Sequence, residues 1–481
     1  MGNSVSNTKN NIPLCVDLDG TLIASDTLLE SMLIALKINP FILFLFPFWI
    51  LNGRAHFKAQ IAKITFPDPA SLPYHQDFMN YVLTEYKSGR EIVLATATLQ
   101  PIADRIAEHL GIFSKVLAST PDHNLRDEKK RKALVDLYGE KGFDYAGDSS
   151  ADLSVWPSAN LAIIVHPKNG VLTKAKQINS NNLVFNKKRN LLKSIIKQIR
   201  VYQWIKNILL FMPILMAHRF ADFGGLIDAG LAFFSFSFTA SFVYVLNDLL
   251  DLESDRKHPR KRFRPLAAGD ISIPLGIALI PLLLIGGIAI ALVVNLQFLM
   301  ILMIYLLLTT LYSFKLKKIM MLDVILLSGL YTIRLLAGSY ASGVEASNWL
   351  LAFSIFIFLS LAFVKRYTEL NVKKQQNKNK LHGRGYSTDD LPIIRTLGTA
   401  SAYISVLILA LYIHSGTVSQ FYSNPDLLWL VTLCLLYWIS RIWILTGRGE
   451  IDDDPIVFTI KDKQSYFIGL IVAILAIGAS L

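Results

Sequence analysis

Residues 247–269 read NDLLDLESDRKHPRKRFRPLAAG, and a strongly apolar segment lies on each side of them. Residues 233–246 before the stretch are FFSFSFTASFVYVL, and residues 273–294 after it are IPLGIALIPLLLIGGIAIALVV. The stretch itself holds ten charged side chains, four acidic and six basic. Acidic groups are unfavourable at a bilayer rim unless they pair or bind a ligand. The arrangement therefore indicates a polar loop with a ligand-binding role between two membrane-spanning helices.

The composition of the 481-residue chain changes part-way along it. Overall, 53% of the residues are hydrophobic and 17% are charged, whereas about 25% are charged in a typical soluble domain. Residues 1–190 mix charged and apolar side chains as soluble domains do. From about Tyr202 the apolar stretches are roughly 17–23 residues long, enough to cross a bilayer as helices. The sequence therefore predicts a soluble domain joined to a membrane domain.

The basic residues predict how the chain crosses the membrane. Lys and Arg concentrate in alternate connections, with six after the second span, three after the fourth and eight after the sixth. The positive-inside rule places these loops and the N-terminal domain in the cytoplasm, and the C-terminus outside a bacterial inner (cytoplasmic) membrane. The net charge of +12 lies mainly in short loops, which favours anionic ligands over nucleic acid. The nine expected spans are residues 202–218, 226–246, 272–294, 297–314, 321–341, 348–364, 393–413, 427–446 and 464–481.

The expected organisation has four parts. Residues 1–10 are a polar, disordered N-terminus, and residues 11–170 form a soluble α/β domain with a helical cap at about 26–85. Residues 171–200 are a polar, basic linker that passes into an amphipathic helix along the inner membrane surface. Residues 201–481 form an all-α membrane domain of nine transmembrane helices.

Three carboxylates follow the second span. Asp248, Asp251 and Asp255 are spaced i, i+3 and i+7. If the helix continues, they lie on one face and repel each other unless a cation lies between them. Mg²⁺ takes oxygen ligands and usually shares them with substrate phosphates. Four basic residues downstream are then placed to bind those phosphates: Arg256, Lys261, Arg262 and Arg264. The alternative is that the basic residues only orient the loop, which leaves the acids unexplained.

The motif NDxxDxxxD at residues 247–255 resembles the first aspartate motif of the UbiA superfamily of intramembrane prenyltransferases. The resemblance covers residues 200–481, and YQWIKNILLF at residues 202–211 is similar to the beginning of that family's first span. It implies a transferase in which Asp248 and Asp251 are catalytic and bind Mg²⁺ together with the third acid of the loop. Substrate contacts are implied for Gln203, Lys206, Asn207 and Asn247.

Further motifs resemble one branch of this superfamily. They are DRKHPRKRFRPLAAGDIS, LDVILLSGLYTIRLLAGSYASG, FVKRYTEL and DDPIVFTIKDKQS. Members of that branch transfer phosphoribose from phosphoribosyl diphosphate to a polyprenyl phosphate, and so make decaprenylphosphoryl-5-phosphoribose. The resemblance implies these two substrates here, with Mg²⁺ assisting the loss of diphosphate.

The second acidic motif departs from the superfamily pattern. Prenyltransferases usually carry two or more acids there, whereas LDVILLSGLYTIR offers only Asp323. Arg334 follows three helical turns later on roughly the same face, and an added cation suits a ligand with an extra phosphate. Lys365, Arg366 and Tyr367 are expected to hold the 5-phosphate or the acceptor phosphate, or alternatively to snorkel at a helix end. The other hypotheses are an ordinary prenyltransferase for an aromatic or other acceptor, which needs a full second motif, and a transporter or scaffold.

The soluble domain has polar residues at the ends of its predicted strands. LCVDLDGTL, residues 14–22, is an apolar strand that ends in DxDGT, and Gly20 permits a turn that brings both carboxylates to one site. EIVLATAT ends a second strand at Thr96, and YAGDSSAD ends a third with Asp148 and Asp152. Strands of this kind with helices between them predict a parallel α/β sheet with its site at the strand carboxyl ends.

This set resembles the haloacid dehalogenase (HAD) superfamily of phosphotransferases over residues 11–170. The resemblance implies a Rossmann-like parallel sheet with a helical cap and a phosphatase that uses Mg²⁺. Asp17 is then the nucleophile that takes the phosphoryl group, and Asp19 is the general acid/base. A carboxylate attacks phosphorus only when cations offset the charge repulsion. The implied metal ligands are Asp17, Asp19, Asp148 and Asp152.

Thr96 and Lys132 are implied to hold the phosphoryl oxygens. Lys129 and Lys130 are close rivals of Lys132, which is preferred because KALVDLYG gives it a helix start with apolar residues following. Alternatively, Asp152 is a buried structural acid and Thr96 only a capping residue. A degenerate, inactive domain is a further alternative, although no core residue of the set is missing.

The cap contains NPFILFLFPFWILNG, residues 39–53, which is short for a membrane span and carries Pro47. It is interpreted as a surface that dips into the membrane and admits a lipid-linked phosphate, the alternative being a buried cap helix. The two phosphate sites suggest that the membrane domain makes polyprenyl-phosphoryl-5-phosphoribose and the soluble domain removes its 5-phosphate. The oligomeric state stays open.

Overall fold

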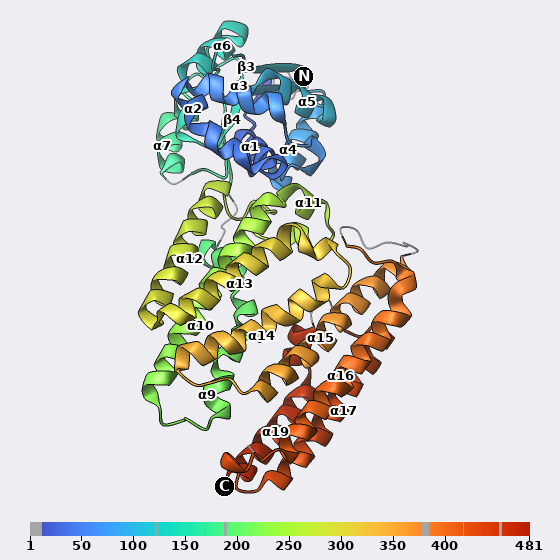
Figure 1. Ribbon diagram of the computed structural model, residues 1–481. Coiled ribbons are helices and arrows are strands. Elements are labelled where there is room, and N and C mark those ends of the chain that lie inside the picture. Colours follow the sequence, from blue (N-terminus) through green and yellow to red (C-terminus); the bar gives the residue numbers. More distant parts are fainter. Residues whose placement is uncertain are drawn as a thin grey trace. The chain divides into compact units, whose positions relative to one another are not determined.

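The computed structural model describes residues 12–121, 123–168, 170–186, 190–376, 384–416, 418–451 and 455–481 (Figure 1). The predicted disordered N-terminus, residues 1–10, lies outside these ranges. The chain divides into two compact units, the first comprising Met1–Ile199 with Tyr244–Ile280. The second comprises Arg200–Val243 with Pro281–Leu481. The charged loop therefore belongs to the same compact unit as the α/β domain, whereas the sequence placed it with the membrane domain.

Six parallel strands form the sheet of the first unit, in the order β3-β2-β1-β4-β5-β6. The strands are β1 (Leu14–Val16), β2 (Ile92–Leu99), β3 (Lys115–Ser119), β4 (Asp144–Gly147), β5 (Ala162–Val165) and β6 (Asn182–Phe185). The helices that alternate with them are α5 (Gln100–Leu110), α6 (Glu128–Tyr138) and α7 (Val171–Ile178). This arrangement confirms the predicted parallel α/β fold.

The sheet is buried on both faces. Leu14 and Val16 pack with Phe78 in one core, whereas Cys15 between them packs with Trp156 in another. Successive side chains of a strand point to opposite faces, so an unbroken apolar run such as β1 suits a sheet covered on both sides. The two cores hold β1 in place, and with it the loop that follows its carboxyl end.

The α/β domain continues beyond residue 170, where the sequence analysis ended it. α7 follows directly, and β6 pairs with β5 in parallel, with Asn182 opposite Ala162. The amphipathic helix is α8 (Leu191–Gln198), which exposes Leu191 and Leu192. Its contact with the membrane surface stays a prediction.

The cap is built from helices inserted between β1 and β2. They are α1 (Thr27–Ile38), the 3₁₀ helix η2 (Pro40–Leu45), α2 (Phe46–Leu51), α3 (Arg54–Ile64) and the short 3₁₀ turn η3 (Pro69–Ser71). They share a small core made of Ala35, Ile42, Phe46, Phe57 and Ile61. The next helix, α4 (Gln76–Lys87), packs against the sheet through Phe78 and Val82. The inserted cap therefore ends before α4 rather than near residue 85.

The apolar stretch of the cap forms two short helices instead of one, with Pro40 beginning η2 and Pro47 in the first turn of α2. Ile42 and Phe46 are buried, but Phe41 is 74% exposed and Leu51 is 84% exposed. Most of the stretch is therefore exposed, which disagrees with the alternative of a buried cap helix. Its contact with a membrane stays a prediction.

Eight helices in the described part of the chain are long and apolar enough to cross a membrane. They are α10 (Phe223–Leu250), α12 (Ile273–Val294), α13 (Leu296–Phe314), α14 (Leu322–Ser342), α15 (Asn348–Gln375), α16 (Leu391–His414), α17 (Leu428–Arg448) and α19 (Lys463–Ser480). Two shorter helices complete this part of the chain, α9 (Met212–Met216) and α18 (Pro455–Lys461). A chain with these helices is a multi-pass membrane protein.

The first of the nine expected spans has a different form from the other eight. It consists of the 3₁₀ helix η5 (Val201–Phe211) followed by α9, and together they are shorter than a full span. Pro213 lies in the first turn of α9, where a proline is readily accepted. α10 and α14 are the most buried of the eight long helices, and each carries one of the acidic motifs.

Candidate functional site

The first candidate site lies at the carboxyl ends of three neighbouring strands. Asp17 directly follows β1, Thr96 lies within β2, and Asp148 directly follows β4. All three side chains are buried. Parallel strands present their carboxyl ends at one edge of a sheet, so these polar groups converge there, as the sequence predicted. Thr96 Oγ1 also accepts the backbone N–H of Thr98 at 3.1 Å.

The lysine of this site is Lys130, and the choice of Lys132 was wrong. Lys130 Nζ lies 3.0 Å from Asp17 Oδ1 and donates to Tyr145 Oη at 2.9 Å, and the side chain is buried. Lys132 is exposed. Residues two apart on an α-helix point in nearly opposite directions. Leu134 is fully buried, and its spacing of four from Lys130 was the signal that placed Lys130 on the inner face.

The carboxylates of Asp17, Asp148 and Asp152 form a group suited to a cation. Their oxygens lie within 4.8 Å of one another, and all three residues are buried. Hard oxygen ligands of this kind suit Mg²⁺. Asp152 also accepts the backbone N–H groups of Asp148 and Ser149. Its position thus agrees both with the predicted metal ligand and with the alternative of a buried structural acid. Lys168, which the sequence analysis missed, places Nζ 3.1 Å from Asp148 Oδ2.

Asp19 has different partners from this group. Its carboxylate accepts the backbone N–H of Thr27 at 2.8 Å and the hydroxyl of Thr98 at 2.7 Å. Burial raises the pKa of Asp19 to about 7, and the negative charge of Asp26 adds to the effect. A carboxyl group with a pKa near neutrality suits proton transfer. The geometry therefore favours Asp19 as an acid/base and not as a ligand through its side chain.

Gly20 allows the loop to bring these acids together. Its φ is +81°, a conformation that L-residues with a side chain rarely adopt. A Cβ at this position would also overlap the carboxylate of Asp148. The glycine of DxDGT therefore both makes the turn and leaves room for the acid of β4.

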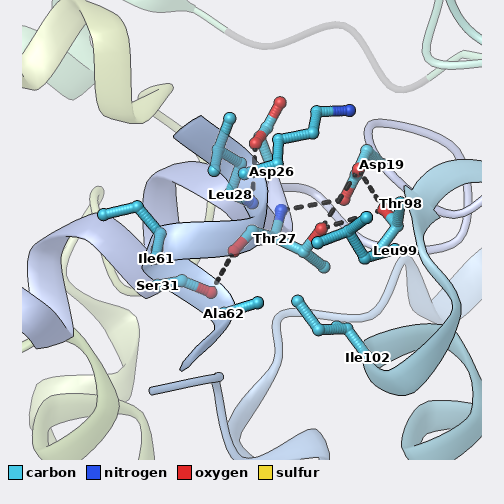
Figure 2. A pocket seen from close by; sticks show the side chains of 11 residues that line it. Asp19, Asp26, Thr27, Leu28, Ser31, Ile61, Ala62, Thr98, Leu99 and Ile102 are labelled. Atoms are coloured by element: carbon cyan, nitrogen blue, oxygen red, sulfur yellow. Dashed lines mark hydrogen bonds between the residues drawn. The ribbon is translucent and has the colours of Figure 1, made fainter. Parts of the chain in front are cut away.

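A pocket beside Asp19 lies between the sheet edge and the cap (Figure 2). Asp19, Thr27 and Thr98 form its hydrogen-bonded polar side. Its apolar lining comes from both the cap and the sheet side, and consists of Leu28, Ile61, Ala62, Leu99 and Ile102. Lys58 also lines the pocket and donates to the carbonyl of Ala97 at 3.0 Å. The pocket therefore places a carboxylate and two hydroxyls opposite an apolar wall.

The acids of the charged loop do not share one face. α10 ends at Leu250 and α11 (Leu252–Lys257) begins after Asp251, so the helix on which the i, i+3, i+7 argument depended is interrupted. Asp248 and Asp255 are buried and both bind Arg264, at 3.0 and 2.5 Å. Asp251 instead pairs with Lys37 of the cap at 2.7 Å. Within the described residues, the three loop acids do not form the metal-ligand group that the sequence predicted.

Arg256 lies in a buried ion pair and not in an open phosphate site. Its guanidinium binds both carboxylate oxygens of Glu30 in α1, at 2.7 and 3.1 Å. The side chains of Arg256 and Glu30 are only 8% and 4% exposed. Gly269 supports the same packing, because a Cβ there would lie 2.6 Å from Cβ of Ala24. The charged loop is thus held against α1, the first helix of the cap, by this ion pair.

The remaining basic residues of the loop are more accessible. Lys261 is 46% exposed and lies 3.9 Å from Asp255 Oδ1. Arg262 is exposed and stacks over the ring of Phe263. Arg264 bridges two of the loop's acids. Lys261 and Arg262 are therefore the predicted phosphate-binding residues that this structure leaves open to a ligand.

In the second unit, Asp323 is surrounded by cations. This fully buried residue pairs with Arg366 at 2.5 Å and with Arg384 at 3.4 Å, and it accepts the hydroxyl of Tyr386 at 2.6 Å. Arg366 also pairs with Glu369. The sequence analysis identified Asp323 and Arg366 but missed Arg384 and Tyr386, whose only signal was their place in a basic connection.

Arg334 belongs to a different cluster from Asp323. Its Nε donates to Asn207 Oδ1 at 2.9 Å, and its guanidinium lies over the ring of Tyr331. Arg334 and Asp323 are eleven positions apart on α14, about 16 Å along the axis, so they do not act as a pair. Lys206 lies over the same Tyr331 ring.

Three other predicted substrate residues are placed as follows. The side-chain oxygen of Gln203 is buried, and among the described residues it has no hydrogen-bond partner. Lys365 and Tyr367 are half-buried on α15, and Tyr367 packs edge-on against Trp443. Asn247 is half-buried on α10, and its carbonyl accepts the N–H of Asp251. Gln203, close in sequence to Lys206 and Asn207, is thus able to accept a donor from a ligand.

Residues 210–471 match the UbiA prenyltransferase family. The chain belongs to this family. An uncharacterised protein of Sinorhizobium fredii is 38% identical over 467 residues, which cover 96% of this chain and 90% of that protein. A decaprenyl-phosphate phosphoribosyltransferase of Corynebacterium glutamicum is 38% identical over 201 residues, covering 38% of this chain and 58% of that protein. A solved UbiA homologue of Archaeoglobus fulgidus with GPP and Mg²⁺ is 15% identical, with a TM-score of 0.46 over 60% of this chain and 99% of that one.

Proposed function

We propose that this UbiA-family protein transfers 5-phosphoribose from phosphoribosyl diphosphate to a polyprenyl phosphate. The observation that carries the proposal is the environment of Asp323, the one acid of the second motif, where Arg366 and Arg384 pair both with it and with Glu369. A prenyl diphosphate needs carboxylates that bind Mg²⁺ at both acidic motifs, whereas a ligand with an additional phosphate needs cations. The similarity to a decaprenyl-phosphate phosphoribosyltransferase supports the same substrate class.

In this reaction, an oxygen of the polyprenyl phosphate forms a bond to C1 of the ribose as the bond from C1 to diphosphate breaks. Mg²⁺ would offset the charge of the leaving diphosphate. To hold it together with Asn247, the loop acids would have to exchange their present partners, Arg264 and Lys37, for the ion. Lys261 and Arg262 supply accessible positive charge on the same loop.

We propose that the α/β domain is a phosphatase and that its substrate is the 5-phosphate of the transfer product. A carboxylate oxygen of Asp17 attacks phosphorus, and the bond to the sugar oxygen breaks while Asp19 donates a proton to that oxygen. Asp19 then accepts a proton from the water that attacks the aspartyl phosphate, which releases inorganic phosphate. Lys130 lies beside Asp17 and offsets the charge of the phosphoryl group, as would Mg²⁺ held by Asp17, Asp148 and Asp152.

The proposed location is a bacterial inner membrane, with the α/β domain and the charged loop in the cytoplasm and the C-terminus outside. The alternation of basic connections supports this orientation. Both phosphate sites are then on the side of the membrane where phosphoribosyl diphosphate is available.

The test is a membrane assay with Mg²⁺, labelled phosphoribosyl diphosphate and polyprenyl phosphate, with the full chain and Asp17→Asn side by side. We expect label in the lipid fraction for both proteins, and one extra phosphate on the lipid made by Asp17→Asn. If no label enters lipid but a prenyl diphosphate reacts with an aromatic acceptor, the chain is an ordinary prenyltransferase. If the two lipids are identical, the α/β domain has another substrate.

A further inference from the structure

A second cluster of metal-ligating side chains lies in the α/β domain, apart from the carboxylate site. His75 precedes α4, Asp77 lies in its first turn, and His166 directly follows β5. One ligand atom from each lies within 4.8 Å of the others. His166 Nε2 is 3.2 Å from Asp77 Oδ2, and the rings of His75 and His166 contact each other with centroids 4.1 Å apart and a tilt of 32°. Residues 91 positions apart in sequence are thus brought to one place.

The side chains of this cluster are held in place by the fold. His75 is 6% exposed, and its backbone N–H donates to the carbonyl of Leu22 at 3.0 Å. The backbone of His166 has φ +42°, which is uncommon for a residue with a side chain and persists only where the surroundings compensate for the strain. Its N–H donates to the carbonyl of Phe185 at 2.7 Å. Asp77 is the accessible member, with 46% of its side chain exposed.

The chemistry of the ligands differs from that of the phosphatase site. Two imidazoles and one carboxylate are typical ligands of Zn²⁺, Fe²⁺, Co²⁺ or Ni²⁺, whereas Mg²⁺ takes oxygen ligands. Ligand atoms that share one such ion at about 2.0–2.1 Å lie on the order of 3–4 Å apart. The observed spacing is close to this, since Asp77 Oδ2 lies 3.2 Å from His166 Nε2 and all three ligand atoms lie within 4.8 Å of one another. A water or an exogenous ligand would complete the coordination.

The position of the cluster indicates what a bound ion would do. The chain leaves the sheet through residues 22–24 to form the cap and returns through residues 73–75. The two segments pair, since Ala24 donates its N–H to the carbonyl of Pro73 at 2.8 Å and Ile23 bridges Tyr74. His75 thus marks the return of the cap, and His166 belongs to the sheet. An ion bound to both would join the base of the cap to β5.

We propose that His75, Asp77 and His166 bind a divalent transition-metal ion that fixes the base of the cap to the sheet. This ion is distinct from the Mg²⁺ expected at Asp17, Asp148 and Asp152, because the ligand types differ. Lys168, two residues after His166, pairs with Asp148. Metal binding at the cluster therefore also stabilises the segment that carries a partner of the carboxylate site.

The experiment uses the untagged full chain in detergent with excess Mg²⁺, so that the oxygen-only sites are occupied. Co²⁺ is added and its visible absorption is recorded, and Zn²⁺ is then used to displace it. We expect equimolar binding, with the more intense absorption of a nitrogen-ligated, low-coordinate ion. Equilibrium dialysis gives the affinity independently of any enzymatic activity.

Three variants identify the ligands. His166→Asn keeps a residue type that tolerates positive φ, His75→Gln keeps a polar side chain, and Asp77→Asn changes only an exposed carboxylate. Each is expected to lower the Co²⁺ affinity about tenfold or more. The control His109→Gln alters an exposed histidine on α5 and is expected to leave the affinity unchanged.

Two results would overturn the proposal. One is the absence of Co²⁺ and Zn²⁺ binding by the wild-type chain, in which case the cluster is an ion pair beside two rings in contact. The other is binding that Asp77→Asn and His166→Asn leave unchanged, which would place the ion elsewhere. Asp77→Asn is fully informative even if His75→Gln does not fold, because its side chain supports no buried packing.

Discussion

The molecule contains two sets of three aspartates, and they behave differently. Asp17 comes from one segment and Asp148 and Asp152 from another, yet their carboxylates converge, with Asp17 and Asp152 beside the buried Lys130 and Asp148 beside Lys168. The loop acids are neighbours in sequence, yet two of them bind Arg264 and the third binds Lys37. Strand ends meet wherever a parallel sheet forms. A helical spacing, by contrast, gives a common face only if the helix continues, and here it breaks at Asp251.

The two sets also differ in what holds their cations. Lys130 is buried beside the acids it neutralises, and it is available to a substrate at the same edge of the sheet. Arg256, beside the loop acids, is held by Glu30 of the cap, which makes it a structural residue of the first unit. Under the proposed function, Lys130 takes part in the chemistry, whereas Arg256 contributes to packing.

The largest expected effect is on stability, from the Glu30–Arg256 pair. Arg256→Gln leaves the buried Glu30 without its partner, and the expected loss is about 3–5 kcal/mol in the free energy of unfolding. The double variant Glu30→Gln/Arg256→Gln should lose less than the sum of the single variants. Thermal and denaturant unfolding of the purified chain measure both. Arg256→Gln with unchanged stability but weakened phosphoribosyl diphosphate binding would instead make Arg256 a substrate residue.

The next effect separates the two lysines of α6. Lys130→Met removes the positive charge beside Asp17, and the rate of phosphomonoester hydrolysis should fall about 10²–10³-fold. Lys132→Met is the matched control and should lower it by less than about twofold, because the side chain is exposed. Hydrolysis of a phosphomonoester by the full chain is measured for both. The opposite ranking would restore Lys132 to the site.

The pH dependence of hydrolysis depends on Asp19. Its pKa is raised to about 7, and the first chemical step needs the protonated acid. Activity should therefore be present below pH 7 and fall about tenfold per pH unit above it, as the proton is lost. In Asp19→Asn the activity should be low, and the decrease in activity above pH 7 should be absent. A falling limb that persists in Asp19→Asn would have to come from another group.

The smallest effect concerns the exposed pair Lys37–Asp251. Its side chains are 49% and 43% exposed, so Lys37→Gln should change the free energy of unfolding by less than about 1 kcal/mol. The same change frees Asp251, and Mg²⁺ binding to the charged loop should become tighter. Calorimetric titration with Mg²⁺ in an Asp17→Asn background measures this at the loop with less contribution from the α/β site. Weaker Mg²⁺ binding would show that Lys37 supports the loop acids instead of competing for them.

The sequence by itself determined the two-part organisation and the identity of most acids. Apolar runs long enough to cross a bilayer are a local property of the chain, and so is the short apolar strand before DxDGT. The convergence of Asp17, Thr96 and Asp148 also followed, because any parallel sheet brings its strand ends to one edge. These conclusions depended on hydropathy and on the order of elements, which tertiary packing does not change.

Only the tertiary structure decided which side chains meet. Lys130, and not Lys132, lies in the site because the rotation of α6 about its axis decides which of its neighbouring lysines faces the core. Arg384 pairs with Asp323 although the connection that carries Arg384 has no distinguishing motif. Glu30 pairs with Arg256, which lies 226 positions away in the sequence. His75 and His166 met because the cap returns beside β5. The spacing of Lys130 from Leu134 was a signal for the first of these contacts, but the others depend on the packing of segments far apart in sequence, which residue spacing does not show.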